Sequence, residues 1–255
     1  MNRAYKIKKL LTYIYKQINR AKNNQNNFRT LMYHSIVPDE TSNINNNMWE
    51  LRLSLFKDQI KFVKENKNFK IYKSGELLNK IPKNGLSITF DDGYKNNYEF
   101  ASPILIEKNI PFTIFIITDY IKNNKKGYLN ENMLKALSNN SLVTIGSHSK
   151  NHYDLTKLSE KNLEDELSYS KLYLEDLIGK EVNSMSYPYG KYNDRIKNKV
   201  KKIGYKLAFT SDFNKNFDEQ NKTNLSRNEI WNTDTIEVFN EKLNGDWDWL
   251  KYRNL

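Results

Sequence analysis

Two carboxylates stand side by side in the segment TFDDGY at residues 89–94. The preceding residues, Leu86–Phe90, have the apolar character of a buried strand, and Gly93 permits a tight exit from it. A turn there can aim Asp91 and Asp92 in different directions, so that one binds a cation while the other faces a substrate. Taken alone, the tripeptide Asp-Asp-Gly is more often only a turn.

Three histidines are the other candidates for chemistry. His148 and His152 lie four residues apart in the segment SHSKNH at residues 147–152, and His34 lies in MYHS at residues 32–35. Each taken singly is as well explained by a surface or structural histidine. The chain has only these three, however, and each follows an expected strand. Two histidines and one aspartate would form an open site for a divalent ion, with positions left for water and substrate.

Strands and helices alternate along the chain. Strands are expected at Phe28–Ile36, Leu86–Phe90, Phe112–Thr118, Leu142–Gly146, Val182–Tyr187 and Lys206–Thr210. Helices are expected at Phe56–Glu65, Asn96–Lys108, Glu131–Leu137, Ser159–Gly179, Asp194–Gly204 and Thr235–Leu243, with loops at Asn23–Asn27 and Asn43–Asn47. This alternation predicts a parallel sheet, open or closed. The carboxylates and histidines would then gather at the carboxyl ends of its strands.

Composition narrows the class of protein. The 255 residues, 38% of them hydrophobic, suit one large α/β domain. The chain has no cysteine, so a transition metal would have to be held by histidines and carboxylates. The net charge of +11 raises the possibility of a nucleic-acid partner, but no basic stretch is interleaved with a recognisable binding motif. We therefore expect no nucleic-acid partner.

The N-terminal segment is basic and amphipathic. Its apolar residues, among them Ile7, Leu10, Ile14 and Ile18, recur at helical spacing with charges between them. This pattern is neither a secretion signal nor a spanning helix, and the protein is expected to be cytoplasmic. Residues 1–20 either lie on an anionic membrane surface, at the inner face of the cytoplasmic membrane, or pack on their own domain.

The order of three motifs carries a family resemblance. TFDDGY, SHSKNH and then SYPYG at residues 186–190 resemble the motifs of the polysaccharide deacetylases, the NodB homology group or carbohydrate esterase family 4. The opening LMYHSI resembles the subgroup that includes the biofilm poly-N-acetylglucosamine deacetylases. The similarity spans roughly Thr30–Thr210. It implies an α/β fold, a distorted (β/α) barrel of about seven parallel strands, with a basic amphipathic helix and Asn-rich linker at 1–27 and a NodB-like deacetylase domain at 28–255.

The resemblance also implies a role for each site residue. One divalent metal ion, commonly Zn²⁺, would be bound by Asp92, His148 and His152. The catalytic groups would be Asp91 as general base, His34 as general acid and the backbone N–H of Tyr189 at the oxyanion. Substrate contacts would come from Tyr94, Pro188 and Arg227.

The implied function is metal-dependent removal of an N-acetyl or N-formyl group from an amino sugar, in surface-glycan biosynthesis. The partner would be an amino-sugar glycan or a lipid-linked glycan.

Two departures from the family pattern bear on this function. The arginine that many members carry before the PYG motif is absent, and Arg227 is the candidate to replace it; no histidine follows His152, which leaves the acid role to His34. The alternative is a catalytically inactive glycan-binding relative on the same barrel.

Overall fold

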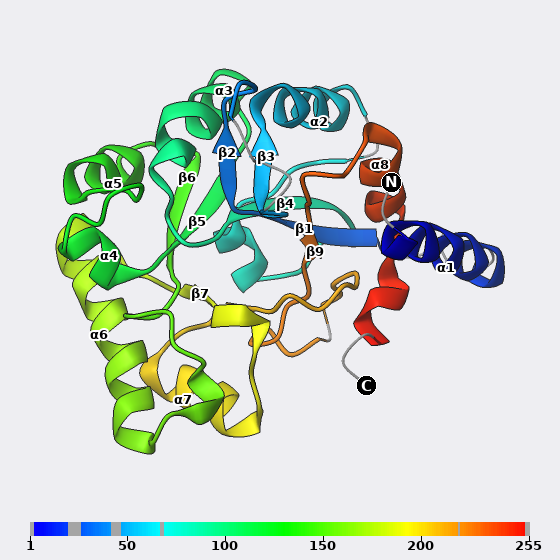
Figure 1. The fold of residues 1–255 in the computed structure, drawn as a ribbon. Coiled ribbons are helices and arrows are strands. Elements are labelled where there is room, and N and C mark those ends of the chain that lie inside the picture. The colour runs from blue at the N-terminus through cyan, green and yellow to red at the C-terminus, as the bar shows by residue number, and fades with distance from the viewer. Residues whose placement is uncertain (1–2, 20–26, 42–46, 67–68, 219, 253–255) are drawn as a thin grey trace.

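A curled sheet of seven parallel strands forms the centre of the fold (Figure 1). In chain order the strands are β1 (Asn27–Tyr33), β4 (Asn84–Phe90), β5 (Phe112–Ile116), β6 (Val143–Ser147), β7 (Ser184–Ser186), β8 (Leu207–Phe209) and β9 (Asn228–Glu229). Their order across the sheet is β8-β7-β6-β5-β4-β1-β9. With the helices around it the sheet forms a distorted (β/α) barrel, so the expected fold class is confirmed.

The structure is a computed structural model that describes residues 3–19, 27–41, 47–66, 69–218 and 220–252. The loops expected at Asn23–Asn27 and Asn43–Asn47 lie almost wholly outside the described residues.

Helices connect successive strands and cover the outside of the sheet (Figure 1). They are α1 (Arg3–Asn19), α2 (Leu53–Glu65), α3 (Ser102–Glu107), α4 (Thr118–Lys122), α5 (Glu131–Ser138), α6 (Glu160–Ile178), α7 (Asp194–Ile203) and α8 (Ile236–Asn244). Shorter elements are the paired strands β2 (Ser35–Val37) and β3 (Glu50–Arg52), a π-helical turn at Asn97–Ala101, and 3-10 helices at Ser74–Leu78, Leu155–Lys157, Pro188–Gly190 and Asp248–Tyr252. The helix α6 begins and ends where the sequence predicts, because the Ser159 side chain accepts a hydrogen bond from the backbone N–H of Asn162 and Gly179 takes a left-handed conformation.

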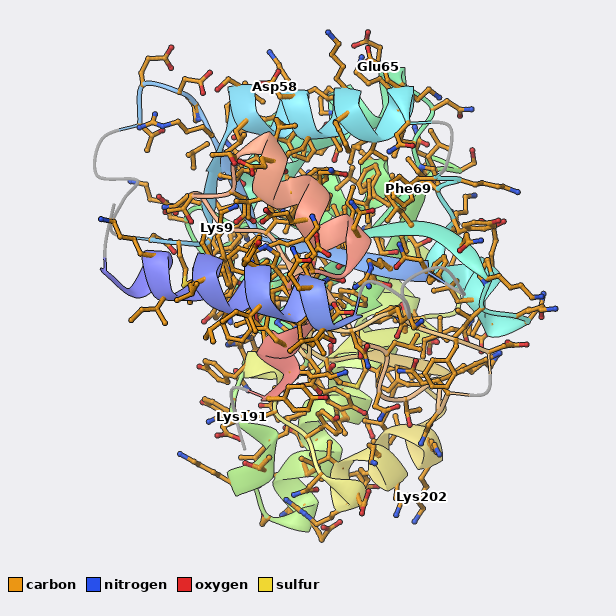
Figure 2. The ribbon with its side chains drawn as sticks, turned by 90° about the vertical axis from the view of Figure 1, so that its right-hand side faces the viewer. Lys9, Asp58, Glu65, Phe69, Lys191 and Lys202 are labelled. Atoms are coloured by element: carbon orange, nitrogen blue, oxygen red, sulfur yellow. The ribbon has the colours of Figure 1, made fainter. Side chains whose placement is uncertain are left out.

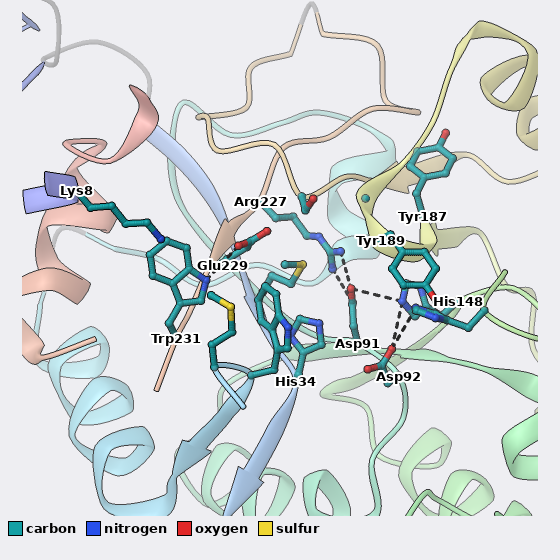
Figure 3. Close-up of a pocket in the computed structure, with 16 residues that line it drawn as sticks. Lys8, His34, Asp91, Asp92, His148, Tyr187, Tyr189, Arg227, Glu229 and Trp231 are labelled. Atoms are coloured by element: carbon teal, nitrogen blue, oxygen red, sulfur yellow. Dashed lines mark hydrogen bonds and ion pairs between the residues drawn. The ribbon is translucent and has the colours of Figure 1, made fainter. Parts of the chain in front are cut away.

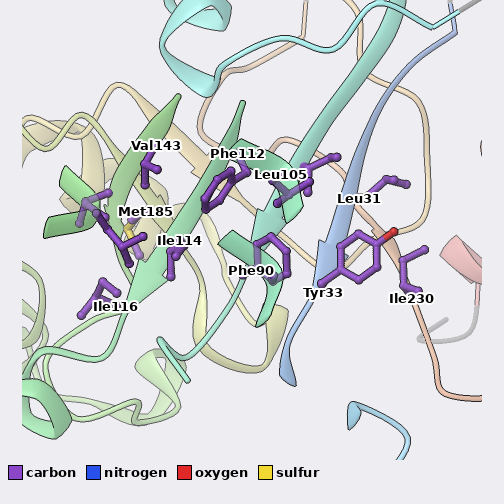
Figure 4. Packing of buried hydrophobic residues seen from close by; sticks show 14 of the residues in the cluster. Leu31, Tyr33, Phe90, Leu105, Phe112, Ile114, Ile116, Val143, Met185 and Ile230 are labelled. Atoms are coloured by element: carbon purple, nitrogen blue, oxygen red, sulfur yellow. The ribbon is translucent and has the colours of Figure 1, made fainter. Parts of the chain in front are cut away.

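The core lies between the sheet and the helices. Every residue of β5 is buried, as expected for a parallel strand with both faces covered. Side chains from neighbouring strands, such as Phe90, Ile114 and Met185, pack in one continuous hydrophobic cluster (Figure 4). The sequence pattern of uninterrupted apolar runs therefore corresponds to burial on both sides of the sheet.

The register of the central strands sets the position of the site. β1 pairs with β4 from Asn27 opposite Asn84 to Tyr33 opposite Phe90, so the two strands end level. The backbone N–H of Asp91 still donates to the carbonyl of Tyr33 at 3.0 Å. The residues that follow the two strands are consequently brought to the same edge of the sheet.

Most expected elements differ in their boundaries by one to three residues, and three of them differ in a way that the local structure explains. The strand expected at Phe28–Ile36 divides at His34, because the chain leaves the barrel there and pairs as β2 with β3. The strand expected at Phe112–Thr118 ends at Ile116, and Thr118 already begins α4. The helix expected at Asn96–Lys108 opens with the π-helical turn before α3. Each change occurs at a strand end or a local widening of a helix, which periodicity does not resolve.

The N-terminal helix α1 packs against the C-terminal part of the chain through its polar side (Figure 2). Lys9 pairs with Glu241 at 3.0 Å, and the Trp249 indole N–H donates to the hydroxyl of Thr12 at 2.9 Å. Lys16 pairs with Asp246 at 2.9 Å. Large apolar side chains of α1 stay exposed: Ile7, Leu10, Leu11, Tyr13, Ile14 and Ile18. Among the described residues, no helix combines the length and apolar character needed to cross a bilayer.

Candidate active site

The site lies at the carboxyl ends of β1, β4 and β6. His34 follows β1, Asp91 and Asp92 follow β4, and His148 follows β6 (Figure 3). These side chains and His152 line one pocket, with a cavity of about 390 Å³. The convergence that the sequence predicted from strand ends is therefore present in the structure.

Asp92, His148 and His152 form a cluster with the geometry of a metal site. The Oδ1 atom of Asp92 lies 3.4 Å from Nε2 of His148 and 3.6 Å from Nε2 of His152, and the three ligand atoms lie within 4.8 Å of one another. This Oδ1 atom is buried and has no hydrogen-bond partner among the described residues. One carboxylate oxygen and two imidazole nitrogens that face a common point fit a divalent ion such as Zn²⁺.

Neighbouring groups favour the forms of His148 and His152 that can bind a metal ion. Nδ1 of His148 lies 2.8 Å from the carbonyl oxygen of Ser186, so it carries the proton and leaves the Nε2 lone pair facing the cluster. Burial, together with the charge of His148, lowers the pKa of His152 to about 4. The imidazole of His152 is therefore neutral near pH 7, the form that binds a metal.

A buried glutamate shapes the loop that carries the two histidines. Glu166 of α6 accepts hydrogen bonds from the backbone N–H groups of Lys150 and Asn151 at 3.1 and 2.9 Å. It also accepts from the Asn151 side chain at 2.7 Å. These bonds hold a loop in which Ser149 and His152 have positive φ angles of 65° and 61°. Such conformations cost about 1–3 kcal/mol each and persist where the surroundings enforce them, often at functional sites.

Asp91 is held in a different environment from its neighbour. Arg227 donates to both of its carboxylate oxygens at 2.7 Å, and the Ser186 hydroxyl donates to Oδ2 at 3.0 Å. Arg227 is itself only 1% exposed, and its Nε donates to the carbonyl of Thr210 at 2.7 Å. Burial alone would raise the pKa of Asp91, but the charges of Arg227 and His148 hold it well below its ordinary range. Arg227, the candidate to replace the arginine that is absent before the PYG motif, thus contacts Asp91.

His34 lies on the opposite side of Asp91 from the metal-type cluster (Figure 3). Its ring packs against Trp49 with 4.5 Å between ring centroids, and its Nδ1 atom is buried without a hydrogen-bond partner among the described residues. Burial lowers the pKa of His34, although the charges of Asp92 and Asp91 oppose this effect. An imidazole in this position can exchange a proton with a group bound in the pocket.

The SYPYG segment forms the rim of the pocket beside His152. Tyr189 has a positive φ of 59°, and its ring packs on His152 with 4.6 Å between centroids. A Cβ atom at Gly190 would lie 1.9 Å from the Ser211 hydroxyl oxygen, so only glycine fits there. This strained turn fixes the backbone of Tyr189 next to the cluster.

Two expected substrate contacts border the site without lining its pocket. Tyr94 and Pro188 are not among the described residues that line the pocket, and Tyr94 stacks on Tyr128 at 5.0 Å. Sequence reasoning missed the pocket residues Lys8 and Trp231, which come from α1 and from the segment after β9. No local motif marks these residues, because only the tertiary fold brings them to the pocket.

Comparison with protein families gives one match over half of the chain. The family profile described as polysaccharide deacetylase matches residues 79–208. Poly-beta-1,6-N-acetyl-D-glucosamine N-deacetylase of Staphylococcus aureus (strain MRSA252) is 31% identical over 175 residues, which cover 62% of this chain and 59% of that protein. The chain spans about 44 to 59% of the length of the first curated relatives that it matches.

Solved structures share the fold. BC0361, a polysaccharide deacetylase from Bacillus cereus, superposes with a TM-score of 0.75 at 27% identity, covering 86% of this chain and 69% of that one. The Streptococcus pyogenes deacetylase PplD, solved in complex with acetate, superposes with a TM-score of 0.77 at 24% identity, covering 85% and 97% of the two chains.

Proposed function

The chain belongs to the polysaccharide deacetylase family, and from that premise we propose that it is a metal-dependent hydrolase that removes the N-acetyl or N-formyl group of an amino sugar. The observation that carries the proposal is one pocket that holds three candidate metal ligands, a buried carboxylate paired with Arg227, and the imidazole of His34, whose Nδ1 atom has no hydrogen-bond partner among the described residues. A protein that only binds glycan needs neither Asp91 nor His34 in this arrangement, so the inactive alternative is disfavoured.

Each side chain has a distinct task in the proposed reaction. Asp92, His148 and His152 would hold the ion, which supplies Lewis-acid polarisation of the acyl carbonyl and of water. Asp91 accepts the proton of the attacking water as the new C–O bond forms. The backbone N–H of Tyr189 supports the developing oxyanion. His34, in its protonated form, donates a proton to the sugar nitrogen as the C–N bond breaks, which releases a carboxylic acid and a free amine and leaves His34 neutral.

Release of acetate or formate from a defined substrate tests the proposal. Relatives named poly-beta-1,6-N-acetyl-D-glucosamine N-deacetylase make β-1,6-linked N-acetylglucosamine oligomers the first substrate to assay. We expect the Zn²⁺-loaded protein to release acetate, and Asp91→Asn to lower kcat by about 10²–10⁴-fold, the usual contribution of a positioned general base. A wild-type protein that binds these oligomers but releases no acyl group from any N-acylated sugar supports the inactive alternative instead.

We also propose that the substrate is a surface-glycan precursor met at an anionic membrane surface, with residues 1–27 as a basic amphipathic helix and linker ahead of the deacetylase domain at 28–255. The support is the orientation of α1, whose polar side is already used in packing while Leu10 and Ile14 are 59% and 46% exposed. Basic residues accompany this apolar face, and no acidic residue occurs before Asp39. The cytoplasmic location expected from the sequence stays a prediction.

A triple variant separates membrane contact from packing. Leu10→Gln, Leu11→Gln and Ile14→Gln change exposed side chains and leave Lys9 and Thr12, which hold the helix on the domain. Wild-type protein should sediment with phosphatidylglycerol vesicles and not with phosphatidylcholine vesicles, and the triple variant should stay in the supernatant. Equal sedimentation of both proteins with anionic vesicles would exclude this contact.

A further inference from the structure

The pocket receives one basic side chain from outside the barrel. Lys8 of α1 lines the cavity, and Figure 3 shows it approaching from the side opposite His148, with its ammonium group directed at Trp231. The Lys8 Nζ atom lies 4.3 Å from the centroid of that ring. The hydrolytic groups described above do not require this lysine.

Contacts of residues that follow Lys8 hold this part of α1 on the domain. The next residue, Lys9, pairs with Glu241, and one turn later Thr12 accepts the indole N–H of Trp249. The Thr12 hydroxyl in turn donates to the carbonyl oxygen of Lys8 at 2.9 Å. α1 therefore presents Lys8 to the cavity from a helix that is bound to the domain at several points.

The charges of the pocket leave Lys8 available to a ligand. Arg227, the other basic side chain that lines the pocket, donates hydrogen bonds to both carboxylate oxygens of Asp91. The carboxylate of Glu229 accepts the Trp231 indole N–H at 3.1 Å. Within the described part of the chain, Lys8 forms no direct ion pair; its charge acts on Asp234 from a longer distance, and its close contact is the face of Trp231.

These observations limit the ligand. The ammonium of Lys8 covers one face of the Trp231 ring, so that face is not offered to a sugar ring for stacking. A lysine ammonium is a compact point charge that binds phosphate and carboxylate oxygens. An oxyanion on the ligand would give the Lys8 ammonium a direct partner in the filled pocket, which a neutral sugar does not provide.

We propose that Lys8 is a specificity-determining residue that binds an oxyanion carried by the substrate close to the N-acylated sugar. The inference rests on the proposed function, because the acyl group must lie at the metal-type cluster for this group to reach Lys8. The oxyanion is a phosphate on the sugar or a carboxylate of a neighbouring uronic acid.

Matched substrates test the proposal on the Zn²⁺-loaded protein. The three probes are the methyl glycoside of N-acetylglucosamine, which is neutral, N-acetylglucosamine 1-phosphate, and a disaccharide of N-acetylglucosamine and glucuronic acid. Wild type should show kcat/KM about tenfold or more higher for at least one anionic probe than for the neutral one, the scale of a charge-assisted hydrogen bond. The preferred probe identifies which oxyanion is recognised.

Variants on the same helix give the controls. Lys8→Met should remove the preference by lowering kcat/KM for the anionic probe, whereas Lys8→Arg should keep most of the preference. Lys6→Met changes an exposed lysine two residues away and should behave as wild type. Thermal unfolding of each variant identifies any loss of folding, and Lys8→Arg keeps the test valid if Lys8→Met is unstable.

The outcomes separate this inference from the proposed function. If wild type hydrolyses the neutral probe but has no anion preference, or if Lys8→Met retains the preference, the role of Lys8 is wrong and the deacetylase proposal stands. If no probe is hydrolysed, calorimetric binding of N-acetylglucosamine 1-phosphate decides. Binding that is about tenfold weaker in Lys8→Met supports the anion site although the proposed reaction fails, and equal binding overturns the site.

Discussion

Asp91 and Asp92 are adjacent in the chain but face different surroundings. Asp91 accepts two hydrogen bonds from a buried arginine, whereas the Oδ1 atom of Asp92 is directed at two imidazoles. The backbone between them makes this possible, because Asp92 takes a positive φ of 70° directly after the strand. One turn therefore gives two identical functional groups different partners.

The pairing of Asp91 with Arg227 predicts a pH effect. Asp91 must be ionised to accept a proton, so activity is lost as the pH falls through its pKa. Arg227→Gln removes the charge that lowers this pKa, and the acid limb of kcat/KM should move upward by about 1–3 pH units. A pH profile of deacetylation measures the change. Arg227→Lys keeps the charge and should move the limb less; an acid limb at the same pH in Arg227→Gln would contradict the assignment.

The role of His34 predicts a dependence on the leaving group. An amine must be protonated to leave, so His34→Asn should lower kcat on an N-acetyl sugar by about 10²–10⁴-fold. An aryl acetate carries a phenolate that leaves without a proton, and its hydrolysis should change by less than about tenfold. Parallel assays of both substrates measure the contrast. Equal losses on the two substrates would assign His34 to a structural role instead.

At the scale of elements, alternation of apolar runs and amphipathic segments was enough to predict the sheet and most of its helices. The spacing of His148 and His152 after β6, and of Asp91 and Asp92 after β4, placed the central site residues correctly at one edge. Short elements such as β3 and β9 were missed, because two or three residues carry no periodic pattern.

The parts of the site that sequence reasoning did not find depend on distant contacts. Glu166 looks like one more charged residue of an amphipathic helix, yet it is 3% exposed and holds the histidine loop. Trp231 and Lys8 are far apart in the chain and meet only through the packing of α1. Such residues follow from tertiary structure, which local propensity and spacing do not contain.

A buried ion pair ties α8 to the segment after β9. Lys242 and Asp234 are both fully buried and bonded to each other, and Lys242 also donates to the carbonyl of Glu229 at 2.7 Å. Burial raises the pKa of Asp234 and lowers that of Lys242, so each depends on the other to stay charged. This pair supports Trp231, whose backbone N–H donates to Asp234 at 2.9 Å.

Breaking the Lys242–Asp234 pair should destabilise the side of the pocket that carries Trp231. Lys242→Met leaves Asp234 buried without its partner, and we expect a loss of about 3–5 kcal/mol in the free energy of unfolding. Denaturant unfolding followed by circular dichroism measures this loss. Adding Asp234→Asn removes the unpaired charge and should restore a large part of the stability. A double variant no more stable than Lys242→Met would show that packing, not charge, sets the cost.

At the scale of the whole molecule, the metal-type cluster joins two parts of the barrel. Asp92 follows β4 and the histidines follow β6, with β5 between them in the sheet. An ion bound to the folded protein and not to the unfolded chain adds stability by mass action. The cluster should therefore couple metal binding to the stability of the fold.

Thermal unfolding measures that coupling without an enzyme assay. Zn²⁺ at about 100 times its Kd should stabilise the protein by about 2.7 kcal/mol, which corresponds to a rise in Tm of about 5–10 °C for a chain of this size. A chelator should reverse the rise. Asp92→Asn should reduce it strongly, whereas Asp165→Asn, an exposed substitution on α6, should not. A Tm that is indifferent to Zn²⁺ in the wild type would argue against the site.

The packing of α1 on α8 has a consequence for biosynthesis on the ribosome. Lys9 and Glu241 are separated by 232 residues. At a synthesis rate of about 5–20 residues per second, α1 emerges about 10–50 s before its docking partner exists. During that interval the basic and the apolar side of α1 are both uncovered. Asp92, His148 and His152 are synthesised within the same interval, before Glu241. The nascent chain can therefore contact a bilayer or a chaperone before Lys8 and Trp231 come together in the pocket.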